Sequence, residues 1–169
     1  MIGDQDMENN ENTNNNQNGQ VPAEIKKNWM VAESVIDELV KKAFVMRQYS
    51  YAPYSGFKVG AALLTRSGSI YGGCNIENAA YGPSNCAERT AFFKAISEGE
   101  REFAAIAIVG GPEDGVKDFC APCGVCRQVM AEFCDAEEFY IILAKSLEEK
   151  KIFTLEQLFP ESFSPRNLH

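Results

Sequence analysis

The sequence predicts an α/β domain in which helices and a β-sheet form layers. Apolar residues run without interruption over 103–109, and 138–143 is similar, which is typical of strands covered on both faces. Segments with apolar residues at helical spacing alternate with these strand-like segments. Such alternation favours a layered α/β architecture, and the length of 169 residues suits one domain.

The first predicted elements are a helix and a β-hairpin. Apolar residues at helical spacing predict an amphipathic helix over 28–49, which ends at a turn built on Pro53 and Gly56. Residues 57–64 and 69–74 predict two strands, with Arg-Ser-Gly as the hairpin turn between them.

A second helix is predicted over 85–98, after a loop at 75–84 rich in Asn, Gly and Pro. Asn85 is its expected N-cap, and Glu88, three positions on, completes the pattern of a capping box. In the purely structural interpretation of this helix start, Cys86 is a small buried side chain. The remaining predicted elements are a strand over 103–109, a loop over 110–122, a helix over 123–134, a strand over 138–143 and a short helix over 154–158.

Charge and composition exclude several classes of function. Hydrophobic residues make up 45% of the chain, and the formal net charge is −8. An acidic protein lacks the basic surface that binds a phosphate backbone, so we expect no nucleic-acid partner. No apolar run approaches the roughly 18 residues of a membrane span, and the start of the chain lacks the features of a signal or transit peptide. The expected location is the cytoplasm, where thiols stay reduced.

The first residues form an acidic, Asn-rich stretch with little apolar surface to bury. Such a stretch cannot offset the entropy cost of its own ordering. The expected organisation is therefore a disordered tail over 1–27 and one domain over 28–169.

Six cysteines and one histidine restrict the chemistry of any active site. His169 is the last residue, which argues against Ser-His-Asp triads, Cys-His nucleophiles and histidine-rich metal sites. Clustered cysteines in a reducing compartment favour a metal or catalytic site over disulfides. Any general base is expected to be a carboxylate.

Three of the cysteines favour a zinc site. Cys123 and Cys126 are three positions apart at a predicted helix start, where both sulfurs can face one metal ion. Cys86 also lies at a predicted helix start, and the helix dipole there favours thiolate. Three thiolates suit zinc and leave a fourth position open for water, which is the catalytic arrangement. Glu88 is then close enough to take a proton from that water.

Two arginines are expected beside these ligands. Arg89 lies three positions after Cys86, and Arg127 directly follows Cys126. Three thiolates and Zn²⁺ sum to a charge of −1, which weakens the metal as a Lewis acid. Hydrogen bonds from guanidinium groups to the ligand sulfurs would withdraw part of that charge.

Residues from about 35 to 164 resemble the zinc-dependent cytidine deaminase family, in its small three-cysteine form, and five motifs within this range are together highly specific. A lone Cys-x-x-Cys motif would not be specific. The motifs are Tyr-Ala-Pro-Tyr-Ser at 51–55, Val-Gly-Ala-Ala-Leu at 59–63, Asn-Ile-Glu-Asn-Ala-Ala-Tyr at 75–81, Cys-Ala-Glu-Arg-Thr-Ala at 86–91 and Pro-Cys-Gly-Val-Cys-Arg-Gln at 122–128.

The resemblance implies a three-layer α/β/α sandwich around a mixed, mainly parallel five-stranded sheet. It implies one Zn²⁺ per subunit, held by Cys86, Cys123 and Cys126. The implied reaction is hydrolytic deamination of cytidine and deoxycytidine to uridine and deoxyuridine plus ammonia, in pyrimidine salvage. A zinc-bound hydroxide would attack C4 while Glu88 shuttles protons.

The resemblance also implies a set of substrate-binding residues and a homotetramer whose subunits share their sites. The partners would be a nucleoside and further copies of the chain, with no nucleic acid and no membrane. The implied roles are Phe57 stacking on the base, Asn75 and Glu77 binding the ribose, the backbone N–H of Ala87 contacting the ring carbonyl, and Tyr81 and Phe163 lining neighbouring sites.

Other interpretations remain open. A structural zinc module with a fourth thiolate from Cys74 or Cys120 would bind a partner and catalyse nothing. A deaminase of the same fold could instead act on another base, although the pair Asn75 and Glu77 favours a nucleoside. The spacing of Cys120 ahead of the Cys-x-x-Cys pair also resembles an iron–sulfur run, but Met130 stands where the fourth cysteine would be.

Overall fold

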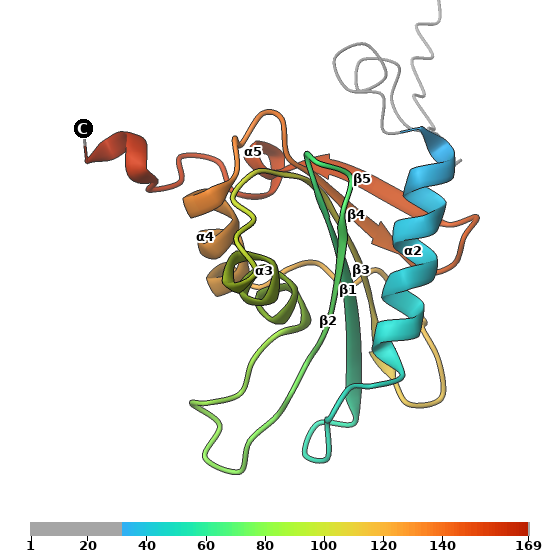
Figure 1. Ribbon diagram of the computed structural model, residues 1–169. Helices are drawn as coiled ribbons and strands as arrows, with labels where there is room; N and C mark the ends of the chain where they lie inside the picture. Colours follow the sequence, from blue (N-terminus) through green and yellow to red (C-terminus); the bar gives the residue numbers. More distant parts are fainter. Residues whose placement is uncertain (1–31, 169) are drawn as a thin grey trace, which may run out of the picture.

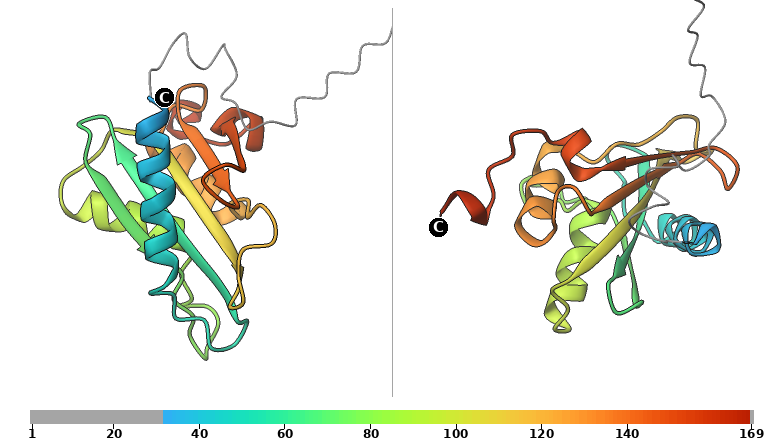
Figure 2. Two further views of the ribbon diagram at one scale, coloured as in Figure 1. Left: turned by 90° about the vertical axis from the view of Figure 1, so that its right-hand side faces the viewer. Right: turned by 90° about the horizontal axis from the view of Figure 1, so that it is seen from above.

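The computed structural model describes residues 32–168, which form a five-stranded sheet with helices on both faces (Figure 1). The strand order is β2-β1-β3-β4-β5. Helix α2 covers one face, and α3 and α4 cover the other (Figure 2), which confirms the three-layer prediction. The elements are α2 (Glu33–Arg47), β1 (Phe57–Thr65), β2 (Ile70–Cys74), α3 (Ala87–Ser97), β3 (Phe103–Pro112), α4 (Gly124–Phe133), β4 (Tyr140–Ala144), β5 (Lys150–Thr154), α5 (Leu155–Leu158) and the 3₁₀ helix η1 (Pro165–Asn167).

The sheet is mixed and five-stranded, as predicted, but the prediction that it is mainly parallel is wrong. Only β3 and β4 pair in parallel, whereas β1 pairs antiparallel with β2 and β3, and β4 pairs antiparallel with β5. The lengths of the connections give the reason. Short turns join β1 to β2 and β4 to β5, and such turns reverse the chain, whereas the β3–β4 connection passes through α4.

Most predicted elements are present within a few residues of their predicted bounds, and two elements were not predicted as such. Strand β5 lies at the sheet edge and is mostly half exposed, so its sequence lacks the continuous apolar run that marks β3 and β4. The short helix η1 carries no periodic signal. The expected tail over 1–27, the start of the helix predicted over 28–49 and His169 lie outside the described residues. Between residues 32 and 168, no helix has the length and apolarity to cross a membrane.

Two apolar cores lie on opposite faces of the sheet. One packs α2 against the sheet, and the other fills the space between the sheet and α3, α4 and α5. Strand β3 is buried over almost its whole length and contributes to both cores, as its continuous apolar sequence predicts.

Two strand glycines allow helices to touch the sheet backbone to backbone. A Cβ at Gly60 would lie 2.0 Å from the carbonyl oxygen of Ala43 in α2. A Cβ at Gly73 would lie 2.3 Å from the carbonyl oxygen of Ala87 and 2.5 Å from the amide nitrogen of Ala91, both in α3. Because helix backbone cannot move aside as a side chain can, Gly73 determines how closely the first turn of α3 approaches β2.

The substitution Gly73→Ala should lower the free energy of unfolding by about 3 kcal/mol, the upper part of the range for overpacking, because the new methyl group meets backbone. The neighbouring Gly72→Ala is the matched control, since its methyl group would meet the flexible end of Met46, 2.6 Å from Sδ. It should cost less than about 1 kcal/mol. Urea unfolding of both variants measures this difference. Equal losses of unfolding free energy would show that the backbone of α3 restricts residue 73 no more than Met46 restricts residue 72.

Candidate active site and metal centre

Helix α3 begins one residue later than predicted, with Cys86 rather than Asn85 as its N-cap, and Cys86 makes no side-chain cap hydrogen bond. The backbone of Asn85 instead exchanges two hydrogen bonds of 2.9 Å with Ile76, and its amide donates to Thr90 Oγ1 at 3.1 Å. Asn85 is therefore held in this bridge and cannot cap the helix. The predicted capping box is wrong, and Glu88 is buried in the protein.

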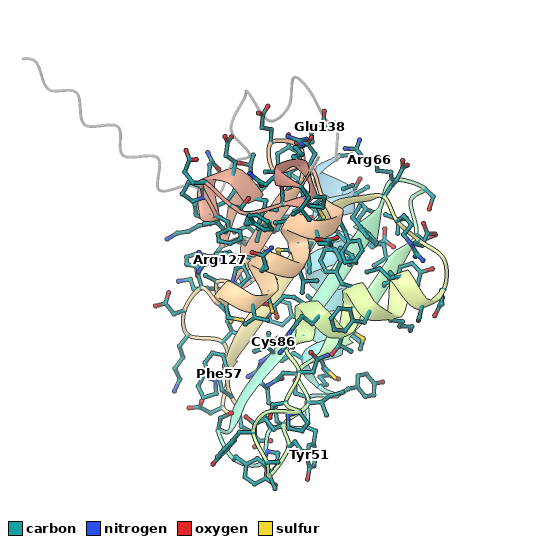
Figure 3. All side chains as sticks on the ribbon, turned by 90° about the vertical axis from the view of Figure 1, so that its left-hand side faces the viewer. Tyr51, Phe57, Arg66, Cys86, Arg127 and Glu138 are labelled. Carbon is teal, nitrogen blue, oxygen red and sulfur yellow. The ribbon has the colours of Figure 1, made fainter. Side chains whose placement is uncertain are left out.

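Three thiols converge where the N-termini of α3 and α4 meet. Cys86 is the N-cap of α3, Cys123 is the N-cap of α4, and Cys126 lies in the first turn of α4. Their sulfur atoms all lie within 4.8 Å of one another, and the Sγ atoms of Cys86 and Cys123 are 3.9 Å apart. Figure 3 labels Cys86 at the start of α3. The structure thus brings together the three cysteines that the sequence singles out.

The geometry and chemistry of this cluster fit Zn²⁺. Zinc–sulfur distances of about 2.3 Å in a tetrahedral site put two ligand sulfurs about 3.8 Å apart. Hydrogen bonds from Cys126 and Arg89 lower the pKa of Cys86 to about 5 despite its burial, so one sulfur is a thiolate at neutral pH. Both helix N-termini add positive potential, which favours anionic ligands.

Glu88 lies beside the thiols in a cavity of about 250 Å³. The side chain is only 5% exposed. Burial, with a further contribution from the charge of Cys86, raises the pKa of Glu88 to about 7. A carboxyl group with such a pKa can both accept and donate protons near neutral pH.

The two arginines make different contacts. Arg89 donates from Nη2 to the sulfur of Cys86 at 3.7 Å and to the carbonyl oxygen of Ser84 at 3.3 Å, which agrees with its expected place beside a ligand. Arg127 donates from Nη1 to the carbonyl oxygen of Leu158 at 2.6 Å, and its guanidinium lies 5.8 Å from the centre of the Phe159 ring. Arg127 therefore ties α4 to the end of α5, and its expected contact with sulfur stays a prediction.

The two residues expected at the ribose, Asn75 and Glu77, both line the cavity. Glu77 accepts hydrogen bonds from the backbone N–H groups of Tyr54 and Ser55 and from the Ser55 hydroxyl. The Ser55 hydroxyl is the main reason that the pKa of Glu77 is lowered, so this carboxylate is charged at neutral pH. Ala87 lines the same cavity at the first residue of α3.

The three aromatic residues expected at the site are exposed in the single chain. Phe57 is 42% exposed at the start of β1, Tyr81 is 73% exposed, and Phe163 is 59% exposed. Tyr81 has a left-handed backbone with φ of 55° and makes an edge contact with Tyr54. The carbonyl oxygen of Phe163 accepts a hydrogen bond of 2.9 Å from Gln128 in α4. None of the three lines the cavity of its own chain.

Several residues that line the cavity have no role in the substrate site predicted from the sequence, and Cys120 appears in the sequence analysis only in the alternative metal sites, a structural zinc site and an iron–sulfur run. Cys120 lines its wall, and burial raises the pKa of this thiol to about 11, so it stays neutral outside the three-sulfur cluster. Val59 reaches the cavity only because β1 pairs with β2 and β3 in the observed register, which no local motif reveals. The other unassigned residues are Ser84, Asn85 and Ala121.

Comparison with known proteins agrees with this site. The family model described as the cytidine and deoxycytidylate deaminase zinc-binding region matches residues 33–143. A cytidine deaminase from Sporosarcina psychrophila is 47% identical over 79% of this chain and 94% of its own length. A cytidine deaminase from Halalkalibacterium halodurans is 47% identical over 78% of this chain and 96% of its own length.

A solved structure shows the same fold. The crystal structure of cytidine deaminase from Burkholderia pseudomallei matches with a TM-score of 0.68 and 45% sequence identity, over 75% of this chain and 97% of that one. The thiol cluster, the match to the zinc-binding region and identities near one half over nearly the full length of the relatives lead to one conclusion. The chain belongs to the cytidine and deoxycytidylate deaminase family.

Proposed function

We propose that the protein is a cytidine deaminase that hydrolyses cytidine and deoxycytidine to uridine and deoxyuridine plus ammonia. The observation that carries the proposal is a cluster of three thiols within 4.8 Å of one another, two of which, Cys86 and Cys123, line one cavity with the buried Glu88. The names of the relatives from Sporosarcina psychrophila and Halalkalibacterium halodurans support the same activity.

Cys86, Cys123 and Cys126 would hold one Zn²⁺ per chain. When bound, zinc lowers the pKa of water and so supplies a nucleophile at neutral pH. Three protein ligands leave a coordination position for this water, in contrast to a closed structural site. Arg89, which donates to the sulfur of Cys86, would withdraw part of the negative charge that three thiolates bring.

Glu88 would carry the protons of the reaction. Its carboxylate would take one proton from the attacking water and pass it to N3 of the pyrimidine ring. It would then take the second proton of that water from the new C4 hydroxyl and deliver it to the amine, which leaves as ammonia. Its burial supports this role, because a buried carboxyl group whose pKa is raised to about 7 can gain and lose a proton readily at neutral pH.

The cavity wall supports a nucleoside as substrate. Asn75 and Glu77 offer an amide and a charged carboxylate to the sugar hydroxyls, and the backbone N–H of Ala87 would contact the ring carbonyl. Phe57, the first residue of β1, would stack on the base. The net charge of −8 argues against a polynucleotide.

We further propose that the protein acts as a homotetramer. Aromatic side chains are enriched in the buried centres of interfaces, and Tyr81 and Phe163 are both more than half exposed here. Each would line the site of a neighbouring subunit. A role in pyrimidine salvage in the cytoplasm completes the proposal.

The activity is tested by adding purified, zinc-loaded protein to cytidine and to deoxycytidine and following the ultraviolet absorbance as uridine and deoxyuridine form. Turnover of either nucleoside, abolished by removing zinc with a chelator and restored by adding it back, is the expected result. A zinc-loaded protein that converts neither nucleoside would refute the proposal.

Glu88→Gln should retain zinc and the fold but lose more than the roughly 10²–10⁴-fold that general acid–base catalysis contributes, because one group serves several proton transfers. Glu98→Gln is the matched control, since it makes the same change at an exposed position just after α3. It should keep normal turnover. A Glu88→Gln variant that keeps more than about a tenth of kcat contradicts the assigned role.

Removal of any one cluster thiol should abolish tight zinc binding. Cys86→Ala, Cys123→Ala and Cys126→Ala should therefore lose the metal, whereas Cys120→Ala and Cys134→Ala should keep it, because neither of these sulfurs belongs to the cluster. Metal analysis after dialysis measures the zinc content. Loss of zinc from Cys120→Ala would instead favour a closed structural site with four thiolates.

Phe163→Ala should raise KM for cytidine while leaving zinc content unchanged, because a neighbour's pocket would lose its aromatic wall. Mixing this variant with Glu88→Gln, after subunit exchange, should restore activity above the mean of the two. In a mixed tetramer an intact Glu88 from one chain can meet an intact Phe163 from another. A monomer mass by light scattering, or a mixture that shows only the average activity, would contradict shared sites.

A further inference from the structure

All four polar groups of Asn75 form hydrogen bonds within the protein. Its backbone N–H donates to the carbonyl oxygen of Val59 at 3.2 Å, and its backbone carbonyl accepts from the N–H of Tyr51 at 3.0 Å. Its side-chain Oδ1 accepts from the N–H of Val59, and its Nδ2 donates to the carbonyl oxygen of Phe57, both at 2.8 Å. Asn75 therefore connects β1 with the segment that precedes it.

The side chain of Asn75 continues the hydrogen bonding along β1 beyond the point where the main chains of β1 and β2 stop pairing. Regular pairing of β1 with β2 ends at Gly60 and Cys74. Beyond that point the main chain turns toward Tyr51, which forms a bridge with Ile76. A carboxamide presents one N–H and one C=O as a peptide group does, so the Asn75 side chain supplies the next two bonds of the ladder.

These bonds hold a wall of the cavity. Val59 and Asn75 line it together, and Phe57 stands two residues before Val59 at the exposed start of β1. On the other side of β1, Phe57 and Val59 pair with Pro112 and Gly110 of β3. Without the Asn75 side chain, this end of β1 would lose two of its hydrogen bonds on the side away from β3, where the backbone N–H of Asn75 and the Ser50 hydroxyl would still donate to the carbonyl oxygen of Val59.

We propose that Asn75 is a positioning residue, which holds the start of β1 and with it Val59 in the cavity wall, independently of any bond to a sugar hydroxyl. The effect of this wall on turnover rests on the proposed function, because it assumes that the cavity receives a nucleoside. One N–H of the carboxamide and one lone pair of Oδ1 remain free, so a bond to the ribose and the positioning role can coexist.

The donor and the acceptor of Asn75 have separable effects. An aspartate would still accept from the N–H of Val59, but it would set a carboxylate oxygen against the carbonyl oxygen of Phe57 with no hydrogen between them. The two side-chain hydrogen bonds of Asn75 to β1 are called the bracket below. Asn75→Asp therefore breaks one of these bonds, and Asn75→Ala breaks both. Asn85→Ala is the matched control, since Asn85 lines the same cavity but its amide bonds to Thr90.

Amide hydrogen exchange of the zinc-loaded full chain without ligand tests the bracket directly. Asn75→Ala should speed exchange at the Val59 amide, whereas Asn75→Asp and Asn85→Ala should leave it slow. Variants are compared only when they keep the zinc content and the far-ultraviolet circular dichroism of the unmodified protein. If Asn75→Ala fails this requirement, Asn75→Ser, which also loses the carboxamide, takes its place. Unchanged exchange at Val59 in the variant that lacks the carboxamide overturns the proposal.

A substrate without sugar hydroxyls separates positioning from ribose binding. If Asn75 acts by holding the wall, Asn75→Ala and Asn75→Asp should both lower kcat/KM on 2′,3′-dideoxycytidine, by about tenfold for the loss of both bonds. If Asn75 acts through the hydroxyls alone, kcat/KM on cytidine falls and kcat/KM on dideoxycytidine stays at the unmodified value, which overturns the proposal. An unmodified protein that turns over neither compound would refute the proposed function. Hydrogen exchange at the Val59 amide would still show whether Asn75 holds the start of β1.

Discussion

The direct contact between the first turn of α3 and Gly73 is the constraint on which the site depends. This turn carries Cys86, Ala87 and Glu88, and it lies against β2 with no side chain between helix and strand. Thr90 adds a hydrogen bond of 3.0 Å from its hydroxyl to the carbonyl oxygen of Cys74. The sheet thus fixes one helix start, and the crossover from β3 through α4 brings the other helix start to meet it. The distances among the three sulfurs follow from these two placements.

The charges of the site are balanced by its position at two helix ends. Three thiolates and the buried carboxylate of Glu88 would repel one another strongly at such short range, because burial lowers the effective dielectric around Cys126 and Glu88. Each helix N-terminus contributes about half a positive charge, and Arg89 adds a guanidinium beside Cys86. A divalent cation supplies the remainder. The raised pKa of Glu88 shows how much burial and the charge of Cys86 already disfavour another anion there, and this is what makes the residue suitable as a proton carrier.

The sequence predicted those parts of the structure that depend on local pattern. Cys86, Cys123 and Cys126 could be assigned because each stands at a helix start. The buried strand β3 could be assigned because its apolar run is unbroken. By sequence, the first turn of α3, which carries Glu88, fits both a capping box and a proton carrier. The N-cap at Cys86 and the burial of Glu88 exclude the capping box. The hairpin predicted between 57–64 and 69–74 implies one antiparallel pair, whereas the antiparallel pairing of β1 with β3 joins distant segments and that of β4 with β5 involves a strand without a clear sequence signal.

Other features could not be predicted because they join segments that are distant in sequence. Val59 lines the cavity because of the register in which β1 pairs with its neighbours. Arg127 can donate to the carbonyl oxygen of Leu158 only when α5 packs beside α4. The bracket formed by Asn75 is of the same kind, since its two bonds depend on where β1 and β2 part.

X-ray absorption at the zinc edge of the purified holoenzyme tests the central claim most directly. A catalytic site should show three sulfur ligands at about 2.3 Å and one oxygen at about 2.0 Å. The oxygen shell should change when a nucleoside that mimics the hydrated base is added, while the three sulfurs stay. Four sulfurs and no oxygen would contradict the account, because they would make the metal centre structural and leave Glu88 without water to activate.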